Sequence, residues 1–246
     1  MFHTIFYEPL YNLVVVMLQL VPMHDIGLAI ILVTIVVKGL LYPLNMSALR
    51  NQHVMKSLEK ELNDIKEKHK DSPQESSRKM MEIYKRENIN PFASLLTIII
   101  QMPILIGLYF VIAKGLQADP TSLYSFVKFP ETLHVEAFGI LDVTKKSLII
   151  AILTGISSYI LARRQTSSME TKKDSSEETF QDHFMKSMKI QLLYVLPLII
   201  AVSAYVLPAA LGLYWITGNL IGILQDFHTK KKLAEMKLGG KLGVRS

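Results

Sequence analysis

A single lysine lies inside an apolar stretch of the sequence, with hydroxyl-bearing residues one helical turn to either side. Lys38 falls in the run 26–44, which holds no other charged residue. On a helix, Thr34 at i−4 and Tyr42 at i+4 share its face, so a hydroxyl, a cation and a phenol form one polar stripe. An ammonium group is costly in hydrocarbon and is expected to face water or protein. The stripe predicts a water-accessible groove; the alternative is that Lys38 snorkels to the membrane surface.

Polar side chains in other apolar segments are candidates for the same groove. Gln101 lies two residues before Pro103, and a proline inside a helix leaves a backbone carbonyl that needs another partner. The last apolar segment adds Tyr214, Trp215 and Asn219. We expect these side chains to line the groove together with Lys38. The alternative is that they serve helix packing and the membrane interface.

The residue types of most enzyme active sites are missing. The chain has no cysteine, which removes thiol nucleophiles, Cys-ligated metals and disulfides. Its seven histidines all lie outside the apolar segments, and no HExxH or P-loop motif occurs. We therefore expect a protein that is not an enzyme, with no catalytic residue, no metal, no cofactor and no small-molecule substrate.

The polar stripe must be positioned by membrane-spanning helices. Half of the 246 residues are hydrophobic and 20% are charged, and the apolar residues are clustered into long runs. A helix that crosses the bilayer needs about 20 mainly apolar residues. The predicted spans are 25–44, 93–113, 147–162, 190–207 and 208–226. The sequence thus predicts an all-α membrane protein with five transmembrane helices around a hydrophilic groove.

The first 24 residues are apolar but do not resemble a signal peptide. Residues 1–24 contain no Lys or Arg, whereas a signal peptide begins with a basic region. Glu8 and Pro9 also interrupt the apolar run and leave too short a stretch to cross a bilayer. We expect an amphipathic helix that lies in the extracytoplasmic interface, in preference to a further span.

Residues 45–92 are predicted to form a charged helical hairpin outside the membrane. Its apolar seam, with coiled-coil spacing, consists of Met55, Leu58, Leu62 and Ile65. Ser72, Pro73 and Glu75 supply an N-cap, a first-turn proline and a capping-box partner for the second helix. That helix must end before Pro91, because proline restricts the residue that precedes it.

Basic residues indicate how the chain is oriented. The segments 45–92, 163–189 and 227–246 hold ten, six and six Lys or Arg residues, whereas 114–146 holds four and the N-terminal segment none. Under the positive-inside rule, the first three are cytoplasmic and 114–146 is extracytoplasmic. The N-terminus is then outside and the C-terminus inside. No transit peptide precedes the first span, so we expect a bacterial plasma (inner) membrane.

The C-terminal segment is a basic tail. Its basic residues are Lys230, Lys231, Lys232, Lys237, Lys241 and Arg245, against one acidic residue, Glu235. With its three glycines, this composition favours a flexible arm that binds anionic surfaces such as ribosomal RNA through phosphate contacts. The alternative is a retention signal that only reflects the positive-inside rule.

Three strings in order resemble the YidC/Oxa/Alb family of membrane protein insertases, in its short bacterial form. The first is 37–44, and the second is 101–104 followed by Leu108 and Tyr109. The third comprises Pro208, Leu213, Tyr214, Trp215, Asn219 and Gln225. Each string alone is weak. Together, with a charged hairpin between the first two, they are specific and cover nearly the whole chain.

The resemblance implies a function and roles for single residues. The groove would open to the cytoplasm and the lipid and be closed on the outer side. The family's groove cation falls on Lys38, its hydroxyl on Thr34 and its aromatic residue on Trp215, and the hydrophobic slide that contacts clients includes Met102 and Pro103. The protein would draw polar client segments into the groove and release transmembrane segments sideways into lipid.

The resemblance also implies partners and leaves alternatives. Nascent membrane proteins and lipids are expected partners, and the Sec translocon and the ribosome are further candidates. The sequence departs from the family where Lys38 replaces the usual Arg, and where Ala162 and Ala210 replace the common Gln and Gly. An anion or small-solute transporter that uses Lys38 as its binding site is the main alternative function. A purely structural assembly factor is the second.

Overall fold

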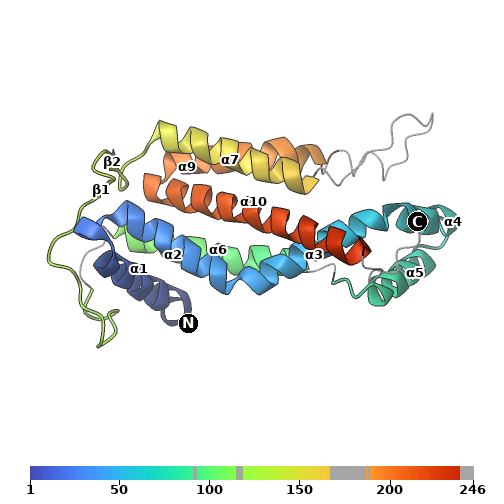
Figure 1. Ribbon diagram of the computed structural model, residues 1–246, viewed down its shortest axis with the longest axis horizontal. Helices are drawn as coiled ribbons and strands as arrows, with labels where there is room; N and C mark the ends of the chain where they lie inside the picture. The colour runs from blue at the N-terminus through green and yellow to red at the C-terminus, as the bar shows by residue number, and fades with distance from the viewer. Residues whose placement is uncertain (91–92, 115–118, 167–186, 188, 239–246) are drawn as a thin grey trace.

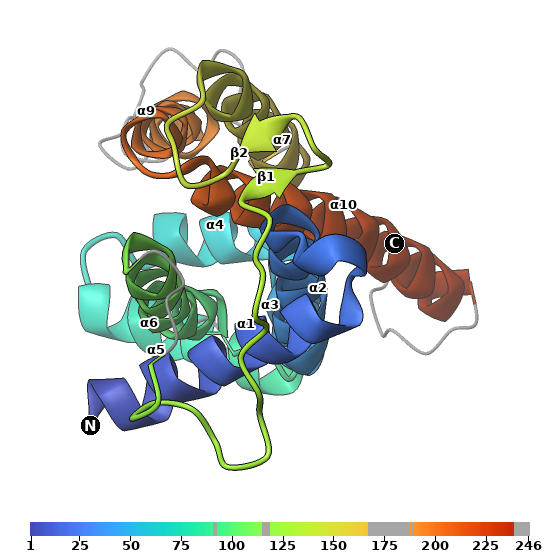
Figure 2. The same cartoon turned by 90° about the vertical axis from the view of Figure 1, so that its left-hand side faces the viewer.

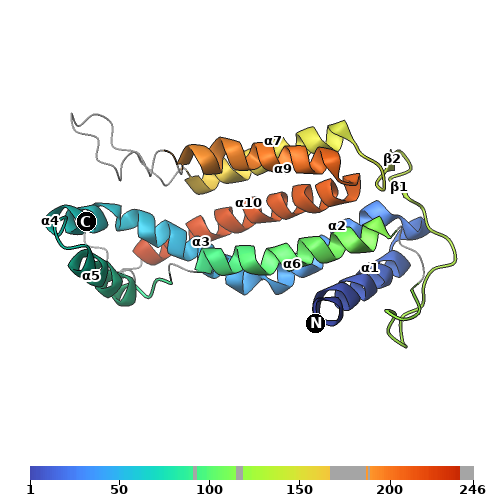
Figure 3. The same cartoon turned by 180° about the vertical axis from the view of Figure 1, so that it is seen from behind.

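The long helices lie side by side in the computed structural model, which describes residues 1–90, 93–114, 119–166, 187 and 189–238 (Figure 1). The α-helices of the described residues are α1 (Glu8–Leu20), α2 (Ile26–Leu40), α3 (Tyr42–Ser57), α4 (Glu59–Lys68), α5 (Pro73–Arg86), α6 (Ala93–Ala113), α7 (Leu148–Thr166), α9 (Leu196–Val206) and α10 (Ala209–Leu238). α7 and α9 form one outer layer, α10 runs through the middle, and α2 and α6 lie on its other side (Figures 1 and 3). The described residues are mostly helical, as the sequence predicts.

The N-terminal segment is one helical stretch that packs into the bundle. A π-helical turn, His3–Tyr7, leads into α1 through helical backbone at Tyr7 and Glu8. Pro9 is the second residue of α1, at the point where the π-helical turn gives way to the α-helix. One face of α1 is buried against α2 and α6 through Leu10, Tyr11, Val14, Val15 and Leu18.

A sharp bend separates α2 from α3 at Leu41. Pro43 explains it, because the proline ring has no N–H for the carbonyl of Gly39 and clashes with that carbonyl. Tyr42 therefore lies beyond the bend, and its side chain is 41% exposed. The predicted straight stripe, which extended from Lys38 to Tyr42, is wrong at Tyr42.

Within the described residues, no single helix is both long enough and apolar enough to cross a membrane. The helices Ile26–Leu40 and Tyr42–Met55 meet that description as a pair, with a bend of 63° between them. Two shorter apolar helices are Ile99–Ala113 and Gln191–Val206, the second of which includes a π-helical turn at Gln191–Val195 that leads into α9.

α10 is the central helix, packed along α7 on one side and α2 on the other. The closest approach to α7 is at Gly212, where an added Cβ would lie 2.2 Å from Cγ2 of Ile150. The Thr154 hydroxyl donates to the carbonyl of Ile150 at 2.7 Å and lies 3.3 Å from that of Gly212. A side chain at position 212 would therefore separate the two helices.

One end of the molecule carries α4 and α5, which pack on each other and on α10 (Figure 1). Their buried apolar cluster consists of Val54, Leu58, Leu62, Ile83, Ile89 and Leu233, with Met55, Ile65, Met80 and Tyr84 packed against it. The predicted seam therefore lies inside this cluster. α5 begins at Pro73 after Ser72, but the Ser72 side chain makes no capping hydrogen bond, so the predicted capping box is wrong.

The last helix is longer than the sequence predicts. α10 continues without a break to Leu238, and Leu233 is buried in the cluster of α4 and α5. The flexible arm predicted from Lys230 onward is therefore wrong for Lys230–Leu238, where contacts with the hairpin fix the chain. Lys241 and Arg245 lie outside the described residues.

The opposite end carries a short antiparallel pair, β1 (Glu136–Ala137) and β2 (Leu141–Asp142), in which Glu136 pairs with Asp142 and Ala137 with Leu141 (Figure 2). Asp25 ties this end to α2: its Oδ1 accepts the N–H of Leu28 as an N-cap, and its Oδ2 accepts that of Phe138 at 2.7 Å. Carbonyls of this segment likewise accept the first N–H groups of α10.

Candidate functional site

A chain of polar contacts crosses three helices. Lys38, in the last turn of α2, donates from Nζ to Oε1 of Gln101 in α6 at 3.0 Å. The Gln101 amide nitrogen in turn donates to the hydroxyl of Tyr214 in α10, whose side chain is 2% exposed. Three of the residues predicted for the groove, from three distant segments, therefore meet in space.

Gly218 of α10 provides the space for the lysine side chain. A Cβ added at Gly218 would lie 3.0 Å from Cε of Lys38 and 3.6 Å from its Nζ. The 3.0 Å contact requires Cε to shift by a few tenths of an ångström, whereas 3.6 Å is an ordinary van der Waals distance, so a side chain at position 218 would lie directly against the lysine stem. Gly218 was not among the predicted groove residues, but with Gly222 it forms a small-xxx-small pair, a sequence pattern that predicts close helix contact.

Thr34 lies one helical turn before Lys38, but its hydroxyl donates to its own helix and not to a groove partner. Its side chain is fully buried, and Oγ1 donates to the carbonyl of Ile30 at 2.7 Å. The Cγ2 atom lies 3.9 Å from the position of an added Cβ on Gly218. Thr34 thus packs against α10 beside the lysine, while its hydrogen bond stays within its own helix.

The other predicted groove residues lie apart from the Lys38–Gln101–Tyr214 contacts. Asn219 donates from Nδ2 to the hydroxyls of Ser157 at 3.0 Å and Ser158 at 2.9 Å, so it joins α10 to α7. Trp215 is half-buried and packs against the main apolar core. Tyr42 lies beyond the bend.

The two residues predicted for the hydrophobic slide lie on α6. Met102 is 49% exposed and Pro103 is half-buried within the helix. Ile99 and Ile106, three and four residues from Met102, are also exposed, so the three side chains share one outward face. Gln101, which hydrogen-bonds Lys38 of α2, also lies on α6.

The departures from the family pattern have separate environments. Ala210 is fully buried in the main core, and its N–H donates to the carbonyl of Val143 at 2.9 Å. Ala162 is half-buried in α7, where its carbonyl accepts the Thr166 hydroxyl at 2.8 Å.

The basic tail residues differ in their surroundings. Lys230 is paired with Asp226 at 3.0 Å, whereas Lys231 and Lys232 are exposed on α10. Lys237 belongs to α10, and its side chain lies outside the described part of the chain.

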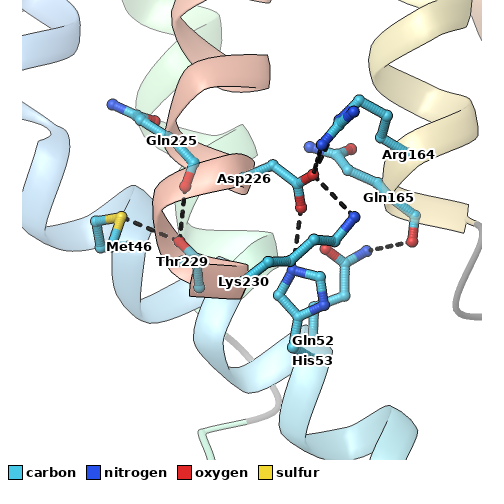
Figure 4. Close-up of polar contacts among 9 residues, drawn as sticks. All are labelled: Met46, Gln52, His53, Arg164, Gln165, Gln225, Asp226, Thr229 and Lys230. Carbon is cyan, nitrogen blue, oxygen red and sulfur yellow. Dashed lines mark hydrogen bonds and ion pairs between the residues drawn. The ribbon is translucent and has the colours of Figure 1, made fainter. Parts of the chain in front are cut away.

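A second polar group, which the sequence reasoning missed, lies near the hairpin (Figure 4). We call Asp226, His53, Arg164 and Lys230 the Asp226 cluster. Asp226 is fully buried; its Oδ1 lies 3.0 Å from Nε2 of His53, and its Oδ2 accepts hydrogen bonds from Arg164 and Lys230 at 3.0 Å. An acidic residue directly after the last apolar run, four residues before a lysine, was the available signal.

A helical bundle with polar contacts between apolar helices is typical of an all-α membrane protein. A family model described as "60Kd inner membrane protein" matches residues 17–236. The chain therefore belongs to this family, which is the YidC/Oxa family.

Individual relatives agree with the family match. The chain is 31% identical to "Membrane protein insertase YidC" of Clostridium tetani, over 85% of this chain and 84% of the relative. The protein of that name from Oceanobacillus iheyensis is 31% identical, over 86% and 77%. That from Shewanella piezotolerans is 32% identical over 81% of this chain, which spans 32% of the relative's length.

Proposed function

We propose that this protein is a membrane protein insertase and chaperone of the bacterial inner membrane. It draws polar segments of its clients into a groove that contains Lys38, Gln101 and Tyr214, and it releases their transmembrane segments into lipid. The observation that carries the proposal is the hydrogen-bonded contact of these three residues across α2, α6 and α10. The family and the names of the relatives support the activity.

The ammonium of Lys38 is the attracting group. It has three N–H donors, and the hydrogen bond to Gln101 uses one of them. An acidic client segment that enters from the cytoplasm gains Coulomb energy in this low-dielectric site, where each charge pair interacts more strongly than in water. Gln101 and Tyr214 keep the ammonium in place between the helices and do not neutralise it.

Release follows from the hydrophobic effect. The exposed face of α6 at Ile99, Met102 and Ile106 is the proposed slide along which a client's apolar segment leaves the groove. Each Å² of apolar surface that moves from water into lipid contributes about 25 cal/mol, so a whole transmembrane segment is strongly drawn outward. The step needs no nucleotide.

We propose five spans, formed by α2, α6, α7, α9 and α10, with the N-terminus outside and the C-terminus in the cytoplasm. The segment 45–90 and the C-terminal part of α10 lie at one end, and 119–146 lies at the other (Figure 1). The basic residues are concentrated at the hairpin end. The positive-inside rule therefore supports a cytoplasmic location for the hairpin.

The proposed partners follow from the same arrangement. Nascent membrane proteins are the clients, and membrane lipids receive them. The hairpin and the exposed Lys231 and Lys232 of α10 face the side from which a ribosome delivers a chain, and the Sec translocon is a further candidate partner.

A two-readout experiment distinguishes insertion from transport. The purified protein is reconstituted into vesicles, and client insertion, scored by protease protection, is measured beside anion efflux from the same preparation. An insertase gives insertion without flux above that of empty vesicles. Flux without insertion would support the transporter that uses Lys38 as an anion site, and neither activity would leave a structural role.

A further inference from the structure

The carboxylate of Asp226 joins three helices near the base of the hairpin (Figure 4). His53 belongs to α3, Arg164 to α7, and Asp226 and Lys230 to α10. Arg164 uses both Nε and Nη2 on the same carboxylate oxygen, and its guanidinium also lies 3.7 Å from the ring centroid of Phe227. The carboxylate therefore has partners from α3, from α7 and from its own helix, α10.

A buried carboxylate is costly unless it is fully paired, so this cluster constrains geometry strongly. Its two permanent cations, Arg164 and Lys230, already compensate the charge of Asp226. The contact with His53 adds the third helix, because neither Arg164 nor Lys230 belongs to α3. Loss of the histidine contact would remove the link from Asp226 to α3 while the pairing of α7 with α10 stayed intact.

α10 contacts both halves of the bent pair of helices. Gly218 lies against Lys38 of α2, and Asp226 contacts His53 of α3. These two points on α10 are eight residues apart, or roughly 12 Å along its axis. The bend at Leu41 lies between the two contacts, so the angle between α2 and α3 is fixed by attachment to one continuous helix.

Further contacts follow the same line along α10. The Thr229 hydroxyl lies 3.2 Å from the sulfur of Met46 in α3, and Leu233 packs into the cluster of Val54 and Leu58. Gln52 also reaches α7, where its amide donates to the carbonyl of Gln165 at 3.4 Å. The Asp226 cluster is thus one part of a longer contact that attaches the hairpin to α10 and α7.

We propose that Asp226 is a positioning residue for insertion: through His53 it holds α3 and the hairpin at the angle that keeps the way to Lys38 open. This inference rests on the proposed insertase function. Asp226 does not touch the client. It acts through α3, which begins directly after the bend that follows the last turn of α2.

The test measures hairpin position and insertion separately. Because the chain has no cysteine, Lys85→Cys in α5 and Ile160→Cys in α7, both at exposed positions, give two specific spin-label sites. Their distance is measured by electron spin resonance in lipid nanodiscs, and insertion is measured in vesicles. We expect Asp226→Asn and His53→Leu to broaden and shift the distance distribution and to reduce insertion several-fold.

Two matched variants separate positioning from folding. His53→Gln keeps a donor for Asp226 and should retain both the distance and most of the insertion. Glu235→Gln removes an exposed carboxylate from the same helix and should change neither. Because His53→Leu leaves Arg164 and Lys230 paired with Asp226, it tests the proposal even if Asp226→Asn does not fold.

Unchanged distances in His53→Leu, or shifted distances with full insertion, would overturn the proposal. Equal insertion losses in His53→Gln and His53→Leu would also overturn it, because a positioning contact is rescued by a conservative donor. If the wild-type protein inserted no client, the proposed function would be wrong, whereas a distance shift would still support the attachment of the hairpin by Asp226.

Discussion

The Lys38 ammonium is a compact charge with one side-chain hydrogen-bond acceptor and a glycine beside its stem. Gln101 accepts from its ammonium, and Gly218 leaves space for its stem. Lysine presents three rotatable donors, whereas the arginine usual in the family presents a rigid planar fork. The lysine can therefore turn its remaining donors toward a client without a change in the surrounding helices.

The Tyr214 hydroxyl should stabilise the network through its bond with Gln101. We expect Tyr214→Phe to lower the free energy of unfolding by about 1 kcal/mol, because the buried amide nitrogen loses its acceptor. Denaturant unfolding in detergent measures this change. Tyr205→Phe, at a half-exposed position of α9, is the control and should have little effect. Equal losses in the two variants would contradict the role of the network.

Three of the residues predicted to line one groove lie in contact, and each is a polar group in an apolar run. Lys38, Gln101 and Tyr214 come together because such groups have to find one another in the bundle. Tyr42 lies beyond the bend because Pro43 ends α2, whereas the predicted stripe assumes one straight helix. Asp226 was missed because its partners at positions 53 and 164 are far away in sequence, and pattern reasoning does not bring them together.

At the scale of elements, the separation of α7 and α10 depends on small residues. An added Cβ at Gly212 would lie 2.2 Å from Ile150, whereas one at Gly39 would meet nothing within 4 Å. Both glycines lie in helices. Substitution by alanine therefore tests overpacking at Gly212 and backbone entropy without a steric clash at Gly39.

We therefore predict opposite changes in stability for two alanine variants. Gly212→Ala should destabilise the protein by about 1–3 kcal/mol through overpacking. Gly39→Ala should stabilise it by about 0.5–1 kcal/mol, because alanine loses less backbone entropy in a helix. Thermal unfolding in detergent gives both values. The same sign for the two variants would refute the close packing of α7 against α10.

The β1–β2 segment should weaken in acid. The Thr144 hydroxyl, and then Lys145, hold the pKa of Asp142 at about 2, below its ordinary 3.8. A carboxyl group whose pKa is lower in the folded state stabilises the fold at pH values above its pKa in the unfolded chain. That contribution is lost as the pH falls from about 4 to about 2. The protection of the amides in 136–145, relative to their intrinsic exchange rates at each pH, should therefore fall over this range, and Asp142→Asn should remove the dependence. An identical pH response in the variant would contradict this assignment.

The length of α10 illustrates what composition alone does not determine. Lysines and glycines suggested a flexible arm, yet 230–238 consists mainly of good helix formers. Leu233 then fixes this segment by packing into the hairpin, a contact that depends on tertiary structure. The helical content, the hairpin seam and, through Pro43, the bend at Leu41 could be predicted from local pattern, whereas the docking of the tail could not.

At the scale of the whole molecule, the two ends differ in character. The hairpin, the Asp226 cluster and the end of α10 form one connected, mainly basic end, and 119–146 covers the other (Figures 1 and 2). A deletion that begins at Lys230 would remove an ion pair and Leu233 as well as positive charge. Single exposed lysines are therefore better probes of ribosome binding.

We predict that Lys231→Gln combined with Lys232→Gln weakens co-sedimentation with ribosomes. Each lost phosphate contact should reduce the salt dependence of binding by about one unit of slope. Lys128→Gln combined with Lys146→Gln, at the opposite end of the molecule, is the control of equal charge. If both double variants bind ribosomes with the wild-type salt dependence, the basic end of α10 is not the ribosome contact.

In the proposed mechanism, the Lys38 ammonium attracts acidic client segments. Insertion into vesicles, scored by protease protection, is compared for two clients that differ only in an acidic or a neutral translocated tail. We predict that Lys38→Ala impairs the acidic client several-fold more than the neutral one, that Lys38→Arg keeps both, and that the exposed Lys146→Ala changes neither. Undiminished insertion of the acidic client by Lys38→Ala would contradict this role of Lys38.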